Sequence, residues 1–318
     1  MGPGLVILSA ALWATVGVAT GLVPSESRWP PEMLALSRLA LAGPILLLLG
    51  LLESRGAFGL LVRLDRRALA IFAMAAAIFQ ISIFHAFPLI GPAACVFISV
   101  GMKPVFGALW MRVSGGAPLS SRDKLAAALG VFGIFLLSVE QFGTASGASW
   151  FAGAALATVA AAAFVAMAFS VSELSGASPT LVSGAGLCLA SLVVLVAIAA
   201  ALTGGVIDMG PIRVDRYSVS LVGYLVLFPT AVAYVAFSLG MRHCSKAFAG
   251  LSAAMVEPAV AAVLACWLLA ESFSSLQVVG GLAMLAVAAL CILSGKQDDA
   301  AAGAPRAALP KGSAAARV

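Results

Sequence analysis

Apolar runs long enough to cross a lipid bilayer occupy most of this 318-residue sequence. About 20 helical residues span the hydrocarbon core, because each adds about 1.5 Å along the helix axis. Ten runs reach about this length: residues 4–23, 33–52, 68–87, 92–112, 123–140, 150–171, 179–202, 217–241, 247–270 and 275–294. Only 10% of the residues are charged, against about 25% in soluble domains. We therefore predict an all-α integral membrane protein with ten transmembrane helices.

The distribution of basic residues predicts how the helices are oriented. With a cytoplasmic N-terminus, the cytoplasmic connectors and the C-terminal tail hold thirteen Lys and Arg residues, and the opposite side holds only Arg28, Arg213 and Arg216. Basic residues accumulate on the cytoplasmic side of membrane proteins, so we expect both termini in the cytoplasm. The net charge of +5 comes from helix ends and not from a basic patch with interspersed aromatic residues, which argues against nucleic-acid binding.

An internal repeat relates the two halves of the chain. Moving residues 77–121 forward by 154 positions aligns them with residues 231–275 without a gap, and places Lys103-Pro104 on Glu257-Pro258. The earlier helices align at offsets of 148–149. We predict one five-helix unit over 1–142, a second over 143–294, and a disordered cytoplasmic tail over 295–318. Because five is odd, the second unit is inverted in the membrane, as in many secondary transporters.

Lys103 and Glu257 are the first candidates for a functional site. A charge at the centre of a transmembrane helix costs about 2.5–3.5 kcal/mol on insertion scales and marks a functional site by default. In one interpretation both residues border a substrate cavity, where the ammonium faces a substrate carboxylate and the carboxylate faces an amine or exchanges a proton. In the other, they form a permanent ion pair between the fourth and ninth helices.

Further polar residues lie in the third and fourth helices. His85 could relay protons or could cap polar groups near the end of its helix, and Gln80 and Phe84 lie close to it in the sequence. Ser99 shares a helical face with Lys103. We include Gln80, Phe84, His85 and Ser99 among the candidate cavity residues.

Aromatic residues and one arginine complete the candidate set. Trp13, Trp110, Tyr234 and Phe237 could line a cavity for amphipathic solutes, or could instead pack between helices or face lipid. Arg38 lies six residues into the second predicted helix. It could snorkel to the interface, pair with Glu140 or Glu271, or gate the cavity mouth.

Other functional classes find no support in the sequence. The five cysteines are scattered without a CxxC pair, so we expect neither a disulfide framework nor a metal site. HExxH, GxSxG and nucleotide-binding motifs are absent, so we expect no enzyme activity and no cofactor. No segment resembles the selectivity filter of a channel.

Three stretches resemble the drug/metabolite transporter superfamily, in particular its ten-helix EamA-type branch. They are ALWATVGVATGLV, LALSRLALAGPILLLL and AYVAFSLGMRHCSKAFAGLSAAMVEPAVAAVLACWLLAESFSSLQVVGGLAML, and the resemblance covers about residues 4–294. It implies a basket-like bundle that moves small organic solutes by alternating access. Lys103 is a departure, because such proteins more often have an uncharged residue at this position.

We therefore expect a secondary transporter in the cytoplasmic (inner) membrane of a bacterium. Its partners would be the lipid bilayer and a small-molecule substrate, an amino acid or a related amphipathic metabolite, and export is the expected direction. The alternative is a proton-coupled efflux carrier for drugs or organic cations. A duplicated ten-helix chain has one pathway of its own and is compatible with a monomer.

Overall fold

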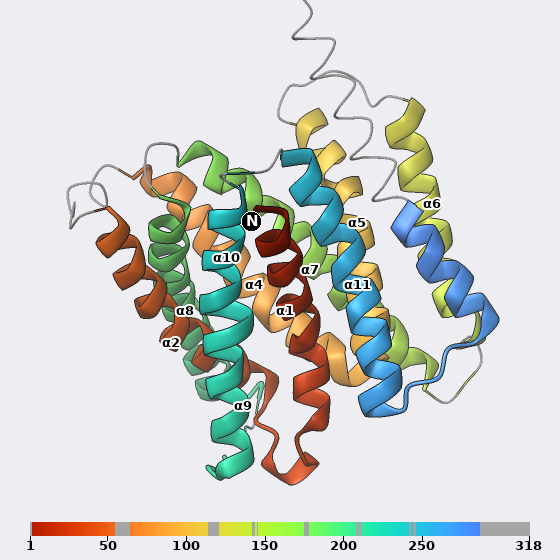
Figure 1. Ribbon diagram of the computed structural model, residues 1–318. Helices are drawn as coiled ribbons and strands as arrows, with labels where there is room; N and C mark the ends of the chain where they lie inside the picture. The colour runs from red at the N-terminus through yellow and green to blue at the C-terminus, as the bar shows by residue number, and fades with distance from the viewer. Residues whose placement is uncertain are drawn as a thin grey trace, which may run out of the picture.

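The computed structural model describes residues 2–54, 64–113, 121–141, 144, 146–174, 178–207, 209, 212–241, 243 and 246–286, and every regular element within them is helical (Figure 1). The long helices are α1 (Gly2–Leu22), α2 (Pro31–Glu53), α4 (Arg66–Ile90), α5 (Pro92–Val113), α6 (Ser121–Ser138), α7 (Gly147–Glu173), α8 (Pro179–Thr203), α9 (Arg216–Val226), α10 (Ala233–Met241) and α11 (Lys246–Leu269). The short elements are η1 (Ser25–Ser27), η2 (Val139–Gln141) and the π-helical η3 (Leu227–Val232), and a last helix covers Ser275–Ala286.

Within the described residues, the ten predicted runs are helical except for the last residue of two of them, Val23 and Ala270, which confirms the all-helical prediction. Seven helical segments are long and apolar enough to cross a membrane, and one of them, Arg216–Gly240, runs through α9, η3 and α10. The three other predicted runs coincide with shorter apolar helices, Ala127–Gln141, Met255–Leu269 and Ser275–Ala286. Residues 287–294 of the last predicted run and the predicted tail lie outside the described residues.

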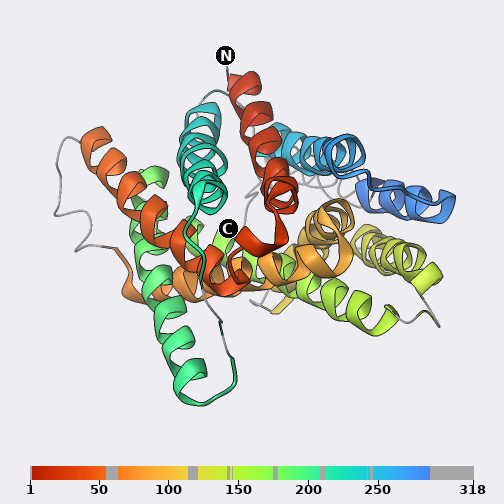
Figure 2. The same cartoon turned by 90° about the horizontal axis from the view of Figure 1, so that it is seen from below.

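Helices from the two halves of the chain alternate in space. α2 packs along α8 and α4 packs along α7, while α1 lies between α10 and α11 (Figures 1 and 2). The contact between α2 and α8 depends on glycine: a Cβ atom on Gly50 would collide with the backbone of Leu181, and one on Gly184 with the backbone of Leu47. Small residues at such contacts allow helix backbones to approach closely inside a membrane.

α6 and the helix Ser275–Ala286 lie side by side at one edge of the bundle (Figures 1 and 2). A Cβ atom on Gly280 would lie 2.9 Å from the carbonyl oxygen of Gly133 and 3.1 Å from the Leu136 side chain. These two helices are therefore in direct contact and lie outside the group that surrounds the centre of the molecule.

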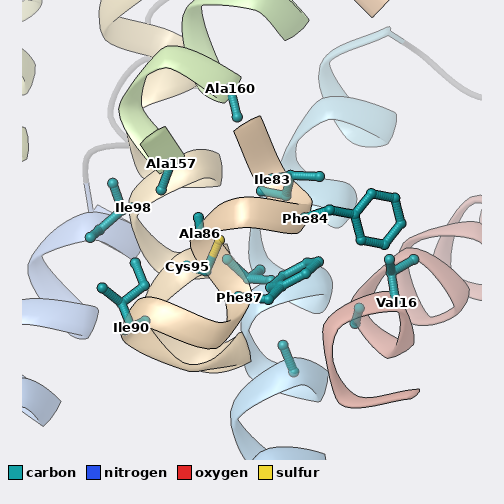
Figure 3. Packing of buried hydrophobic residues seen from close by; sticks show 14 of the residues in the cluster. Val16, Ile83, Phe84, Ala86, Phe87, Ile90, Cys95, Ile98, Ala157 and Ala160 are labelled. Atoms are coloured by element: carbon teal, nitrogen blue, oxygen red, sulfur yellow. The ribbon is translucent and has the colours of Figure 1, made fainter. Parts of the chain in front are cut away.

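The largest group of buried apolar side chains joins α1, α4, α5 and α7. Figure 3 shows the rings of Phe84 and Phe87 on the side of α4 that faces Val16 of α1. Phe84 and Phe87 are 3% and 7% exposed, and their rings meet edge to face with centroids 6.1 Å apart. This aromatic pair fills the space between α1 and α4.

A capping box fixes the start of α9. Asp215 Oδ1 accepts hydrogen bonds from the backbone N–H groups of Tyr217 and Ser218, both at 2.9 Å, and Ser218 Oγ accepts one from the Asp215 N–H. Ser27 of η1 donates a further bond to Asp215 Oδ2. The hydroxyl of Ser27, followed by the N–H groups, lowers the pKa of the Asp215 carboxyl, because each donor stabilises its ionised form. The linker between α1 and α2 is thereby attached to the first turn of α9.

Candidate functional site

Lys103 of α5 and Glu257 of α11 meet where these two helices cross. Lys103 Nζ lies 3.7 Å from Glu257 Oε2, and the two side chains are 19% and 14% exposed. The ammonium also lies 4.1 Å from the centre of the Phe164 ring of α7, in position for a cation–π interaction. The two charged residues that the repeat places at equivalent positions are therefore in contact with each other.

Arg38 is buried beside this pair, with only 5% of its surface exposed. Its Nε donates to Thr230 Oγ1 at 2.8 Å, its Nη1 to Gln80 Oε1 at 3.2 Å and its Nη2 to the Pro229 carbonyl at 3.3 Å. One side chain of α2 is thus bonded to α4 and to the π-helical segment η3. Within the described residues no ion pair joins Arg38 to Glu140 or Glu271, the two partners that the sequence suggested.

Pro229 explains the irregular helix that receives Arg38. Proline has no N–H to donate to the carbonyl four residues earlier, which is that of Leu225, and the Thr230 hydroxyl donates to this carbonyl instead, at 2.7 Å. Single π-helical turns inside α-helices are frequent at functional sites. The same hydroxyl accepts from Arg38, so the deformation of the helix and the position of the guanidinium depend on one side chain.

Aromatic rings enclose the space next to these charges. Trp13 contacts Tyr234 edge to face, with ring centroids 5.9 Å apart, and Phe79 contacts Phe164 at 5.7 Å. The resulting space, which we call the central cavity, is lined by Trp13, Val16, Arg38, Phe79, Gln80, Ile83, Phe87, Val96, Ser99, Lys103, Phe164, Tyr234 and Glu257. These residues come from α1, α2, α4, α5, α7, α10 and α11.

The central cavity is narrow. Its volume is about 60 Å³, enough for a few water molecules, whereas pockets for drug-sized ligands measure about 300–1,000 Å³. Binding an organic solute here therefore requires the lining side chains to move apart.

A second space, the Trp29 cavity, adjoins the central cavity and has a volume of about 300 Å³. It is lined by Gly17, Thr20, Gly21, Ser25, Arg28, Trp29, Pro31, Leu34, Phe84, Phe87, Pro88 and Pro92. Phe87 lines both cavities. A Cβ atom on Gly17 would lie 2.6 Å from Cε1 of Phe87, so this ring occupies the space that the absent side chain leaves. Phe87 therefore belongs to the wall of both cavities.

Seven of the predicted residues share the central cavity: Trp13, Arg38, Gln80, Ser99, Lys103, Tyr234 and Glu257. The other four lie outside it. Phe84 lines the Trp29 cavity, Phe237 packs on Trp13 with centroids 5.3 Å apart, and Trp110 stacks on Phe169 at 5.5 Å. His85 Nε2 lies 2.9 Å from Glu32 Oε1.

The apolar part of the lining and the hydrogen-bond partners of Arg38 were not predicted from the sequence. Phe79, Phe87 and Phe164 lie in predicted spans that each contain several aromatic residues, where none of the three stands out. A signal was available for Phe164, because an offset of 148 places Val16 on it. Pro229-Thr230 inside a predicted span was the available sign of irregular helix at membrane depth, which is tolerated where it faces protein or a cavity.

Among the described residues, no group of three or more His, Cys, Asp or Glu side chains could hold a metal ion.

The bundle has a counterpart among known folds. A protein of known crystal structure aligns with 94% of this chain and 98% of its own length, with a TM-score of 0.62 and 19% sequence identity. At this identity the likeness concerns the fold. A comparison with curated proteins gives no match.

The sequence comparison with protein families is more specific. Residues 1–139 match the EamA-like transporter family. The EamA resemblance is thereby confirmed for this part of the chain, which contains α1, α2, α4, α5 and α6, and so four of the seven helices that line the central cavity. The description of the matched family is that of transporters, the class of protein that the sequence predicts.

Proposed function

We propose that this EamA-like protein is a secondary transporter that exports small amphipathic solutes, amino acids or related metabolites, across the cytoplasmic membrane of a bacterium. The central cavity is the observation that carries this proposal. Three charged residues from otherwise apolar helices converge there, among the rings of Trp13 and Phe164. Such convergence in an apolar site suits a solute with both charged and apolar parts.

The pairing of helices supports an inverted repeat with units 1–142 and 143–294. In the order of the repeat, α4 corresponds to the continuous helix of α9, η3 and α10, and α7 corresponds to α1. The contact of α4 with α7 therefore has its counterpart in the contact of α10 with α1. The contacts of α2 with α8 and of α5 with α11 each join two equivalent helices. This is the pattern that a two-fold axis in the membrane plane would produce.

The lining of the central cavity follows the same relation. Lys103 and Glu257 are 154 positions apart, as are Gln80 and Tyr234, and all four line the cavity. A substrate site at the interface between repeats is the arrangement expected of transporters with inverted units.

We further propose that Phe87 closes the central cavity on one side during alternating access. The ring lines both the central cavity and the Trp29 cavity, and Pro88 follows it inside α4. Proline removes a backbone hydrogen bond within a helix, which supports local bending at this point. With both termini in the cytoplasm, the Trp29 cavity would face the opposite side of the membrane.

Counterflow into proteoliposomes tests the proposed function. Vesicles with the purified chain and an unlabelled solute inside should accumulate the same labelled solute, tried across amino acids, aromatic amines and sugars. Mass spectrometry should recover the solute unchanged. Lys103→Ala and Glu257→Ala should abolish the flux while the protein stays folded, and Glu26→Ala, which alters an exposed carboxylate, should retain it. Normal flux in both cavity variants would contradict the proposed site.

Proton-coupled efflux of drugs or organic cations is the alternative function, and the observation in its favour is the Glu257 carboxylate in the cavity wall. A carboxylate inside a membrane can exchange a proton for a cationic solute. This alternative requires that export of amines depend on a proton gradient and that it stop in Glu257→Gln. Flux that persists without a proton gradient indicates facilitated movement instead.

A further inference from the structure

The charges that line the central cavity do not balance. Among its described lining residues, Arg38 and Lys103 are cationic and Glu257 is anionic, which leaves one positive charge in excess. Inside a membrane protein an unbalanced charge is expensive, because little water is present to solvate it. The identity of the excess cation therefore bears on what the cavity binds.

The excess positive charge belongs to Arg38. Lys103 is paired with Glu257 at 3.7 Å and lies over the Phe164 ring. Arg38, in contrast, donates to a hydroxyl, an amide oxygen and a backbone carbonyl, all of them uncharged. These three bonds hold the guanidinium in place without neutralising it.

Arg38 retains the capacity to bind an anion. A guanidinium carries five N–H donors, and the three bonds to Thr230, Gln80 and Pro229 engage one on each nitrogen. A carboxylate that reached the cavity side of Arg38 could accept from the remaining N–H groups of Nη1 and Nη2. Hydrogen bonds between charged groups are about twice as strong as those between neutral ones.

We propose that the central cavity selects solutes with one net negative charge, whose carboxylate binds Arg38 while the Lys103–Glu257 pair stays intact. This rests on the proposed transport function and narrows its substrate class. A monoanion brings the total charge of the cavity to zero, a zwitterion leaves it at one positive charge, and an organic cation raises it to two. The rings of Trp13, Phe79 and Tyr234 surround the apolar body of the solute, so an aryl-substituted carboxylate fits best.

Three solutes with the same phenyl and two-carbon skeleton test this inference: 3-phenylpropionate, phenylalanine and phenethylamine. Binding to the purified full-length protein is measured at neutral pH by the quenching of tryptophan fluorescence and by isothermal titration calorimetry. The anion should bind about tenfold or more tightly than the zwitterion, and the cation should bind least. A preference for phenylalanine or phenethylamine overturns the inference.

Variants of Arg38 separate its charge from its structural role. Arg38→Gln should lose the preference for the anion, whereas Arg38→Lys should retain part of it. Thermal unfolding and gel filtration report whether each variant folds. If Arg38→Gln does not fold, the order of the three affinities in the unchanged protein tests the inference by itself. A folded Arg38→Gln protein that keeps the full anion preference contradicts the assignment.

Counterflow with the same three solutes distinguishes this inference from the proposed function. Exchange of phenylalanine or the amine without exchange of the acid upholds transport and overturns anion selection. Binding of the acid with the predicted preference, but without exchange of any solute, upholds the anion site and contradicts transport. If no solute binds and no solute is exchanged, both the anion site and the proposed transport function are overturned.

Discussion

Lys103 Nζ lies 3.7 Å from Glu257 Oε2 in the wall of the central cavity. The pair therefore joins α5 to α11 and borders the space for a solute at the same time, so the two interpretations of these charges are compatible in this conformation. Any movement that separates α5 from α11 must break the contact. An attraction that is broken and remade would contribute to the balance between conformations of the transporter.

Each single substitution in this pair should destabilise the protein. The double substitution should cost much less stability than the sum of the two single losses. Lys103→Met or Glu257→Gln leaves one charge without its partner, and breaking a buried pair in this way costs about 3–5 kcal/mol, an upper estimate for side chains that remain partly exposed. The double variant leaves no such charge. Thermal unfolding in detergent should show a loss well below the sum of the single losses. Additive losses would mean that the two charges do not interact, and Lys103→Arg, which keeps the charge, is the control.

Thr230→Val should weaken both the π-helical segment and the position of Arg38. The hydroxyl donates to the Leu225 carbonyl and accepts from Arg38 Nε, and valine has the same shape without either bond. Leaving buried groups unpaired costs about 1–3 kcal/mol, so the thermal midpoint and the flux should both fall. Thr230→Ser keeps the hydroxyl and should retain most of both. Equal behaviour of the two variants would show that the hydroxyl has no such role.

The sequence was sufficient to predict the helices and the charged centre of the site. Long apolar runs have one structural solution in lipid, since only a helix satisfies all its backbone groups within a single segment. Opposite charges at equivalent positions of a repeat then led to Lys103 and Glu257, which the structure brings together. The first inference depends on local composition, and the second on a comparison of the two halves of the chain.

Depth in the bundle and helix register explain why the positions of some residues were not predicted from the sequence. Trp110 shares a helical face with Lys103 but lies seven residues further on, about 10 Å along the axis, and stacks on Phe169 instead of reaching the cavity. The partners of Arg38 depend on the π-helical turn at Pro229 and Thr230, which shifts the side chains from the positions that a regular helix predicts. Helical periodicity predicts the face of the helix on which a residue lies. Only the residues of that face that lie at the depth of the cavity can line it.

Acid should weaken the attachment of η1 to α9 through Asp215. Hydrogen bonds from Ser27 and from the first turn of α9 lower the pKa of this carboxyl, so its ionised form stabilises the fold. That contribution is complete above the ordinary Asp pKa of about 3.9 and is lost as the pH falls through the lowered value in the folded protein. Hydrogen exchange at the Tyr217 and Ser218 amides should therefore show a protection that declines in this range.

Two variants check the assignment to Asp215. Asp215→Asn keeps a side chain able to cap the helix but cannot titrate, so its protection should no longer vary with pH in this range. Ser27→Ala removes the largest cause of the lowered pKa and should move the loss of protection to higher pH. An unchanged profile in both variants would assign the acid sensitivity to another group.

Gly17→Ala should impair transport by displacing the Phe87 ring. A Cβ atom at this position would lie 2.6 Å from Phe87 Cε1 and 2.9 Å from Pro92 Cβ, closer than carbon atoms can pack, so the ring has to leave its position in the wall of the two cavities. Gly4→Ala is the matched control in the same helix, because no atom lies within 4 Å of its Cβ position. Counterflow should fall in Gly17→Ala and stay normal in Gly4→Ala. Combining Gly17→Ala with Phe87→Leu, which shortens the opposing side chain, should restore part of the flux. If the combined variant is no better than Gly17→Ala alone, the defect does not act through Phe87.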